Sequence, residues 1–474
     1  MRDIDGIFAA LRALGTARLL AVLYLAYGLA GSVVLSLALP PLQTPDENRH
    51  ALRVSHLANG HLLGELFEMP GTDGKMYPVT GGPVDPALVA VMEPFLSLRS
   101  QPAQRAKATM WEPRHLWSAE RVRMNFITSM YAPMLYLPQV ATVQVARAMG
   151  ASVVDTLTMA RIAAGACAVA VGAAAIAMAG GSAVWLFALL TLPMSLAGMG
   201  TIGPEGLLLT VSALVAALLW RMLRGQARAG AFAVVVAGLC LVVMTRPAYV
   251  ALALLPLAVR SMAWRSRLAG MAVVLAAALA WSAVATVTGV PNVGAYLGAA
   301  PAAQTALLLS EPWRVLNLVT NTMQANWLGY WYSFIGVLGW LDTLLTPTYY
   351  RLAGWLLLVA LAATLLRPRA AQASEEEAGW GTAGWIAATI LGMLGGIFGI
   401  LYLTWSPVGH PIIDGVQGRY FLPIAMLAGV ALPGLARGAW VVPIRRALVA
   451  AVAIFPAYSL GTAISAVIAR YYLT

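Results

Sequence analysis

Apolar segments long enough to cross a bilayer recur along most of this chain, and they restrict it to a membrane fold. A crossing helix needs ~17–25 mostly apolar residues. The chain of 474 residues is 60% hydrophobic and only 10% charged, with a mean hydropathy of +0.77, and a soluble domain would not tolerate such a surface in water. The first segment, 19–39, leads into Pro40 and Pro41 without a small-residue cleavage site, which indicates an uncleaved helix. We therefore expect an all-α polytopic membrane protein.

Arginine clusters at the ends of these segments predict how the chain is threaded. Basic residues are enriched in cytoplasmic loops, so Arg2, Arg12 and Arg18 place the N-terminus inside. Further cytoplasmic turns are expected at 221–228, 260–267, 367–369 and 437–446. The resulting path has eleven crossings and leaves the C-terminus outside. Its segments are 19–39, 157–179, 183–200, 204–222, 229–245, 247–260, 268–289, 350–366, 382–405, 419–436 and 447–469.

One apolar stretch, residues 127–149, does not fit this count. It carries Pro133 and Pro138, and if it crossed, the arginine-rich turn at 221–228 would face outward. We interpret it as a re-entrant or interfacial helix, and a full crossing, which would make twelve, stays open. The chain is expected to form one membrane domain, 1–474. Its parts are a first helix (1–40), an outer loop (41–126), a bundle (127–289), a second outer loop (290–349) and C-terminal helices (350–474).

Other features exclude some protein classes. Cys167 and Cys240 both lie within apolar segments, so they indicate neither a disulfide framework nor a metal cluster. The net charge of +11 comes from arginines spread among helix ends, which is typical of residues that set topology and not of a nucleic-acid-binding surface. In the first outer loop, the amphipathic pieces 50–63 and 86–98 are expected to lie on the membrane surface.

The polar run Thr44-Pro45-Asp46-Glu47-Asn48-Arg49-His50 follows the first crossing directly. Charges at the mouth of a membrane helix are costly, so function is the default explanation and an ordinary polar helix exit is the alternative. Asp46 or Glu47 could act as a catalytic base. The two carboxylates could instead hold a divalent cation such as Mg²⁺ or Mn²⁺, with Glu47 the better ligand. His50, one helical turn beyond Asp46, could bond the carboxylate or a phosphate, or simply cap and pack.

More polar groups lie at outward helix ends along the predicted path. Glu205 begins a membrane helix, where the positive end of the helix dipole also stabilises a carboxylate. Arg246 stands apart from the cytoplasmic arginines. Arginine suits a phosphate because its planar fork binds two oxygens at once. The remaining candidates for binding a substrate or its phosphate are Trp340, Asp342, His410, Asp414, Gln417, Arg419 and Tyr420.

Several motifs resemble a known family over most of the chain. The resemblance rests on Pro45-Asp46-Glu47 with His50, on residues 131–138 (YAPMLYLP), on Arg161, and on residues 334–342 (FIGVLGWLD) and 415–423 (GVQGRYFLP). These are similar to the bacterial membrane-protein family called domain of unknown function 2142. That family looks like a branch of the GT-C glycosyltransferases, multi-span enzymes that take a sugar from a polyprenyl-phosphate carrier outside the cytoplasmic membrane.

The resemblance implies roles for two acidic positions. In GT-C enzymes an acidic residue of the first outer loop is the base, and here Asp46 or Glu47 stands at that place. A second acidic residue often lies at the outer end of a later helix, where this chain has Glu205. The chain departs from the family at residues 201–205 (TIGPE), where Ser-x-Ser-Pro-Asp is usual, and this departure bears on the role of Glu205.

The chemistry of such a transfer accounts for these residue types. A polyprenyl-phosphate sugar carries a good leaving group, so the enzyme has to deprotonate an acceptor hydroxyl and stabilise the departing phosphate. Asp46 or Glu47 can do the first, and Arg246 or Arg419 the second. One base without a second nucleophile predicts inversion at the anomeric carbon.

We therefore expect a glycosyltransferase of the bacterial cytoplasmic membrane. It would act at the extracytoplasmic face on a cell-envelope glycan, lipid or protein acceptor. A polysaccharide polymerase or ligase that uses a lipid-linked donor is one alternative. A lipid or sugar transporter is another, and it would be expected to show paired halves and charges near the bilayer midplane.

Overall fold

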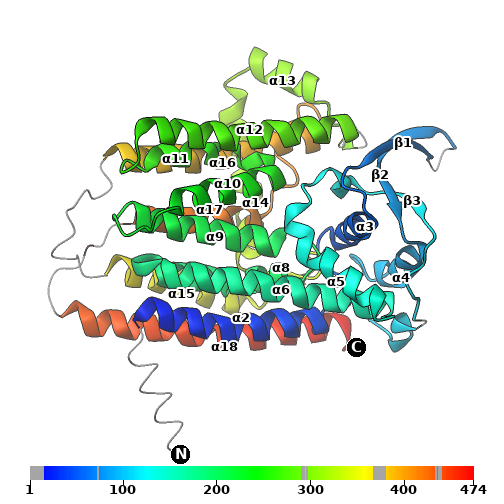
Figure 1. The fold of residues 1–474 in the computed structure, drawn as a ribbon, viewed down its shortest axis with the longest axis horizontal. Helices are drawn as coiled ribbons and strands as arrows, with labels where there is room; N and C mark the ends of the chain where they lie inside the picture. Colours follow the sequence, from blue (N-terminus) through cyan, green and yellow to red (C-terminus); the bar gives the residue numbers. More distant parts are fainter. Residues whose placement is uncertain are drawn as a thin grey trace, which may run out of the picture.

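Most helices of the protein run roughly parallel between two ends of a bundle, and a smaller mixed domain covers one of these ends (Figure 1). We refer to residues 41–149 as the cap domain. The structure is a computed structural model that describes residues 15–71, 74–112, 114–289, 294, 297–366, 380–432, 435 and 440–473. Of the predicted cytoplasmic arginines, Arg2, Arg12, Arg367, Arg369 and Arg437 lie outside the described residues.

Seven helices of the described chain are long and apolar enough to cross a membrane, which confirms the expected all-α polytopic fold. Their most apolar windows have mean hydropathies between 1.4 and 2.1. They are α2 (Thr16–Ala38), α6 (Val153–Met178), α9 (Glu205–Met222), α12 (Trp264–Thr288), α15 (Pro347–Leu365), α16 (Trp380–Trp405) and α18 (Val441–Tyr471). The pair of η4–α7 (Gly180–Ser182 and Ala183–Leu190) and α8 (Pro193–Met199) is bent by 79° and is either a broken eighth span or a re-entrant segment.

Three expected crossings are shorter than predicted, so the count by length is seven or eight and not eleven. They are α10 (Ala231–Thr245), η5–α11 (Pro247–Leu254 and Leu255–Ala258) and η7–α17 (Gly418–Phe421 and Leu422–Ala431). All three pack inside the bundle against α9, α12 or α16. The chain between α10 and η5 breaks at Arg246 and Pro247, because proline cannot donate the backbone hydrogen bond that a continuous helix needs. Residues 127–149 form only the turns η2 (Ile127–Met130) and η3 (Met134–Tyr136) and the 12-residue helix α5 (Leu137–Ala148).

The cap domain contains a sheet that the sequence analysis did not predict. The strands β1 (Glu65–Pro70), β2 (Met76–Val84) and β3 (Val122–Asn125) pair antiparallel in that order. Gly81 allows the pairing, because a side chain there would collide with the backbone oxygen of Met124. The helices α3 (Glu47–Ala58) and α4 (Pro86–Leu96) flank this sheet, and the turn η1 spans Ala108–Trp111.

Helix α3 is not the surface helix that its amphipathic pattern suggested. Ten of its twelve residues are buried, because α5, β2 and η2 pack around it. The polar face that we expected to meet water or lipid headgroups instead carries Arg53 and His56, whose side chains bond backbone carbonyls of the cap domain. Because α3 is buried, it fixes the position of the residues directly before it, Thr44 to Asp46.

The second expected loop, 290–349, is largely helical where it is described. It forms α13 (Pro301–Ser310), the 22-residue α14 (Arg314–Ile335) and a short hairpin of β4 (Val337–Leu338) and β5 (Thr343–Leu344). The end of α14 packs tightly on η7, since a side chain at Gly418 would collide with the backbone oxygen of Tyr330. Ser333 accepts a hydrogen bond from the Gly418 backbone at 2.8 Å. This contact positions the following residues, Arg419 and Tyr420.

The first and last helices lie side by side and connect the bundle to the cap domain (Figure 1). The end of α18 is fixed to the cap domain by backbone and side-chain hydrogen bonds. The Ala106 amide donates to the Tyr471 oxygen at 2.8 Å, and Arg470 donates to the carbonyls of Leu98 and Gln104 at 3.0 Å each. The cap domain is therefore held at the end of the bundle where α2 and α18 both finish.

Candidate functional site

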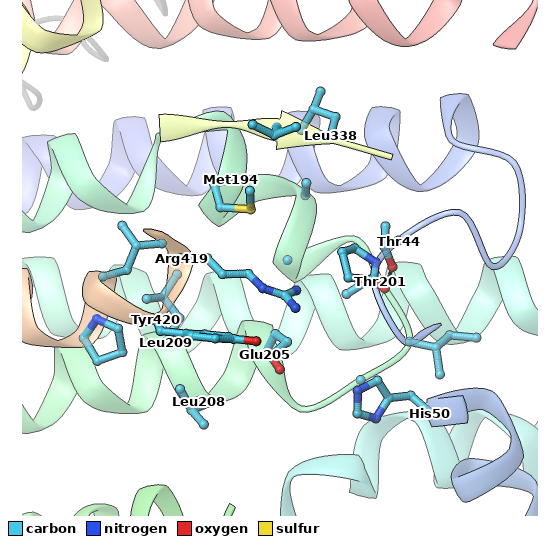
Figure 2. A pocket seen from close by; sticks show the side chains of 18 of the residues that line it. Thr44, His50, Met194, Thr201, Glu205, Leu208, Leu209, Leu338, Arg419 and Tyr420 are labelled. Carbon is cyan, nitrogen blue, oxygen red and sulfur yellow. Dashed lines mark hydrogen bonds between the residues drawn. The ribbon is translucent and has the colours of Figure 1, made fainter. Parts of the chain in front are cut away.

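A cavity lies where the cap domain meets the bundle, with an empty volume of about 730 Å³ including its open part. We call it the polar cavity. Its walls come from the start of α3, the 201–204 loop, α9, η5, the β4 strand and η7. Figure 2 shows Arg419, Glu205 and His50 directed into this space from three separate segments. The topology thus brings together positions that are far apart in the sequence.

The polar cavity is lined by one guanidinium group, that of Arg419, and one carboxylate, that of Glu205, and a second guanidinium, that of Arg246, lies beside this carboxylate. Arg246 forms an ion pair with Glu205, and both side chains keep about a fifth of their surface exposed. The Tyr420 ring lies beside both arginines, 5.0 Å from Arg246 and 5.4 Å from Arg419. The Nε atom of Arg419 is buried and has no hydrogen-bond partner within the described chain. An arginine held by ring contacts with an unsatisfied donor is suited to receive an anion.

His50 lines the cavity as a neutral imidazole. Its Nδ1 is 2.7 Å from the Tyr136 hydroxyl, and Tyr131 and Tyr136 place their rings 5.6 and 5.8 Å away. Burial lowers the pKa of His50 to about 4, although Glu205 and Asp46 act in the opposite direction. With His50 neutral, the charged residues that line the cavity are Glu205 and Arg419. Arg246 lies outside the lining and pairs with Glu205, so the three groups together carry one net positive charge.

The polar cavity also has apolar walls. They include Leu208 and Leu209 of α9, Leu422 and Pro423 of α17 and Leu338 of β4. Figure 2 shows Leu338 and Leu208 on different sides of Arg419 and Glu205. A ligand that fills this space therefore needs an anionic part and an apolar part.

Glu47 is fully buried and lies outside the cavity lining, in contrast to the prediction that it acts as a base or a metal ligand. Arg161 donates to both of its carboxylate oxygens at 2.6 Å. The amide and hydroxyl of Thr44 and the amide of Ile202 also donate to this carboxylate. Burial opposes ionisation, but the Arg161 charge and these hydrogen bonds outweigh it and lower the pKa of Glu47. These donors occupy the oxygens that a cation would need, so the residues present do not fit a Mg²⁺ or Mn²⁺ site at Glu47.

Asp46 is placed differently from its neighbour. Its side chain is exposed and accepts no hydrogen bond from the described residues, and its backbone is left-handed, with φ at 61°. Only Gly and sometimes Asn or Asp adopt this conformation readily, and such residues are frequent at functional sites. Thr44 and Pro45 before it and His50 after it line the cavity. Asp46 itself is not part of the cavity lining, and its exposed carboxylate belongs to the segment between the lining residues Pro45 and His50.

Trp340 and Asp342 have structural partners instead of facing the cavity. The Trp340 indole donates to the Leu42 oxygen at 2.9 Å and stacks under Arg99. Asp342 forms a buried ion pair with Arg470 at 2.9 Å. The cavity is lined nearby by Val337, Leu338 and Gly339, so the predicted substrate-binding motif contributes its backbone turn and not its polar side chains.

The loop 410–417 also lies away from the cavity lining. His410 and Asp414 are 3.1 Å apart and both partly exposed. Gln417 has a buried side-chain oxygen without a partner in the described chain. Of the predicted loop residues, only Arg419 and Tyr420 line the cavity. Glu205, Arg246, His50, Arg419 and Tyr420 are thus brought together as predicted, whereas Trp340, Asp342, His410, Asp414 and Gln417 are not.

Sequence reasoning missed three polar cavity residues, Thr44, Thr201 and Tyr249. The hydroxyls of Thr44 and Thr201 bond one another across the junction of the first helix and the 201–204 loop, and both line the cavity. Tyr249 donates to the Tyr420 oxygen at 2.9 Å and closes the wall near Arg246. A neutral hydroxyl near a helix end does not by itself indicate a functional residue in a sequence. Thr44 could have been considered, because it lies in the same polar run as Asp46.

Comparison with known proteins matches a family model described as "Predicted membrane protein (DUF2142)" to residues 29–428. The matched region contains every residue that lines the polar cavity. No curated protein and no solved structure matches the chain.

Proposed function

Since the chain belongs to the predicted membrane protein family DUF2142, and since its polar cavity combines charged and apolar walls, we propose that it is a glycosyltransferase. It transfers a sugar from a polyprenyl-phosphate donor to a hydroxyl of a cell-envelope glycan, lipid or protein. The observation that carries this proposal is the unpaired guanidinium of Arg419 beside the Arg246–Glu205 ion pair and the leucine wall. A lipid-linked sugar phosphate has the matching chemistry, with one anionic group between a sugar and an apolar chain.

The charge of the cavity favours a monophosphate donor. A phosphodiester carries one negative charge, and Glu205 and Arg419 of the lining together with Arg246, which pairs with Glu205, carry one net positive charge when His50 is neutral. Arg419 has an unused donor for a phosphate oxygen. Arg246 can share its guanidinium between Glu205 and the phosphate, because arginine has five donors in a fixed fork.

The transfer then needs one base. The acceptor oxygen attacks the anomeric carbon, the bond from that carbon to the phosphate oxygen breaks, and the polyprenyl phosphate leaves with the electron pair. Asp46 takes the hydroxyl proton, since its carboxylate is free of hydrogen bonds and lies next to two cavity residues. Arg246 and Arg419 stabilise the charge that develops on the leaving phosphate. A single displacement inverts the anomeric carbon.

The direction of the bundle supports a position in the bacterial cytoplasmic membrane with the cavity on the outer side. The described arginine clusters at Arg221, Arg224, Arg260 and Arg265 belong to helix ends remote from the cap domain. Because basic residues are retained on the cytoplasmic side, the cap domain and the polar cavity would face the extracytoplasmic side. Polyprenyl-linked sugars would then reach Asp46 from the outer leaflet.

The test uses the purified full-length chain in liposomes, with polyprenyl-phosphate sugars of several kinds and envelope fractions as acceptors. We expect wild-type protein to release polyprenyl phosphate in step with sugar transfer. Asp46→Asn should lower the turnover by about 10²–10⁴-fold, the usual contribution of a general base. Glu93→Gln, which neutralises an exposed carboxylate of the cap domain, is the control. Wild-type protein that transfers none of these sugars, or that moves the intact donor across the membrane, would refute the proposal.

A further inference from the structure

A second cavity lies deeper in the bundle and adjoins the polar cavity. It has an empty volume of about 290 Å³ including its open part, and it is bounded by α9, α10, η5–α11, α16 and α17. We call it the apolar cavity. Its walls include Val215, Leu239, Val242, Leu255, Met393 and Leu427. Its one polar wall residue, Ser212, donates its hydroxyl hydrogen to the Leu208 oxygen at 2.7 Å, and the other wall residues are apolar.

The two cavities follow each other along the same helices. Pro423 lines both of them. On α9, the polar cavity is lined by Glu205, Leu208 and Leu209, and the apolar cavity by Ser212 and Val215. These positions are three or four residues apart and so share one face of the helix. From Glu205 to Val215 this face extends by about 15 Å, at ~1.5 Å per residue.

Helix α10 repeats the same arrangement. Leu239 and Val242 line the apolar cavity, and Arg246 follows at the end of the helix beside Glu205. Both helices therefore present charge at the end near the cap domain and apolar side chains towards the middle of the bundle. This order of charge followed by apolar surface is that of an amphiphile with a phosphate head and a hydrocarbon chain.

We propose that the apolar cavity is the binding site for the part of the donor's polyprenyl chain next to its phosphate. The inference rests on the proposed function and adds to it the path of the lipid into the bundle. With the phosphate at Arg419 and Arg246, the first isoprene unit lies against Leu208, Leu209 and Pro423. The units that follow enter between α9 and α17 and contact Val215 and Leu427. Chain contacts there make long-chain donors bind more tightly than short ones.

The experiment fills the cavity and measures lipid binding without any transfer reaction. Val215→Phe places a ring in the apolar cavity, and Val273→Phe makes the same change on α12 at a side chain that is 52% exposed. Binding of undecaprenyl phosphate and of dimethylallyl phosphate, which has a single isoprene unit, is measured by native mass spectrometry of the full-length chain. We expect Val215→Phe to weaken undecaprenyl phosphate binding about tenfold, the effect of losing roughly two buried methylene contacts. Dimethylallyl phosphate binding should stay unchanged, and Val273→Phe should change neither.

Two further measurements keep the inference testable. Leu427→Phe fills the same cavity from α17, and it should give the same selective loss if Val215→Phe does not fold. A polyprenyl phosphate with a photoreactive first chain segment should label α9 and α17. Equal effects on both lipids, no effect from either filling variant, or labelling confined to lipid-exposed helix faces would overturn the inference. Selective loss of long-chain binding in a protein that transfers no sugar would retain the chain site and refute the transferase.

Discussion

Arg161 of α6 holds the Glu47 carboxylate through both oxygens, with each donor 2.6 Å from its acceptor. The same guanidinium donates to the carbonyls of Ser36, Leu39 and Pro40 at the end of α2. Glu47 in turn accepts from the Ile202 amide in the loop before α9. This one pair therefore connects α2, α3, α6 and the 201–204 loop, and it fixes the two segments that precede Asp46 and Glu205.

Glu47→Gln should destabilise the protein strongly. Removing one partner of a buried ion pair leaves an uncompensated charge and typically costs about 3–5 kcal/mol. The exposed pair of Glu65 and Arg123, 3.5 Å apart, provides the matched control, because Glu65→Gln should cost no more than about 1 kcal/mol. Unfolding midpoints in detergent measure both. Equal midpoints for the two variants would contradict the connecting role of Glu47.

The same pair predicts a dependence of stability on acid. The pKa of Glu47 is lowered in the folded protein, so its contribution is complete above the unfolded pKa of about 4.3. It is lost as the pH falls through the folded pKa, because the native carboxylate must then take up a proton. We expect the unfolding midpoint of wild-type protein to drop below pH 4 and that of Glu47→Gln to drop less. Parallel curves would show that Glu47 does not contribute.

Asp46→Gly should separate stability from activity. Glycine adopts the left-handed conformation of this position, φ 61°, without the steric cost that a side chain carries, so we expect unchanged or slightly higher stability, by up to about 1 kcal/mol. Sugar transfer should fall as it does in Asp46→Asn, since both variants lack the carboxylate. Thermal unfolding and turnover are measured on the same preparation. Activity that survives in both variants would remove Asp46 from the base role.

Arg419→Ala should weaken donor binding with little effect on folding. Its Nε has no partner in the described chain, so the fold loses few contacts, whereas a hydrogen bond to a charged phosphate is worth about 1.5–3 kcal/mol, or roughly 10- to 100-fold in affinity. Arg351→Ala removes an exposed arginine that bonds only the nearby Thr348 hydroxyl and serves as the control. An unchanged donor affinity in Arg419→Ala would exclude the phosphate role.

His50 should make the protein less stable in mild acid. The folded pKa is about 4 and the ordinary value is 6.5, so between these values the unfolded chain binds a proton and the folded one does not. Stability therefore falls as the pH drops through this window, by roughly 3 kcal/mol in total. His50→Gln keeps a hydrogen-bonding group for Tyr136 but cannot titrate, so its unfolding midpoint should decline less between pH 6.5 and 4. An identical decline would mean that His50 is charged in the folded state.

Much of the fold could be predicted from the sequence because bilayer crossings have a simple physical signature. The apolar length of α2, α6, α9, α12, α15, α16 and α18 identified each of them. The break at Pro247 was predicted, but the segments on either side of it are shorter than a crossing. The cap sheet was missed because its pairing depends on tertiary contacts such as Gly81 against Met124. A pattern of alternating exposure in β1 becomes visible only once β2 is in place.

The candidate site was predicted only in part, because the sequence does not show which charged side chains already have an ion-pair partner. Glu205 and Arg419, both predicted from the sequence, do line the polar cavity, and Arg246 pairs with Glu205, whereas their roles in catalysis stay predictions. Sequence alone could not distinguish a charge that faces a cavity from one that is already paired. Glu47 and Asp342 look as reactive as Asp46 in the sequence, but Arg161 and Arg470 occupy them, and both arginines lie far from their partners along the chain.

The contact between α18 and the cap domain has a consequence for how the protein is made. Arg470 bonds a carbonyl 366 positions earlier in the chain, so the segment around Gln104 leaves the ribosome long before its partner exists. The cap domain therefore lacks its hydrogen bonds to Arg470 while the helices between it and α18 are synthesised and inserted. The bonds from Arg470 to the cap domain can form only after α18 has been made, although the residues that line the polar cavity, Thr44 to Pro423, are all made before α18.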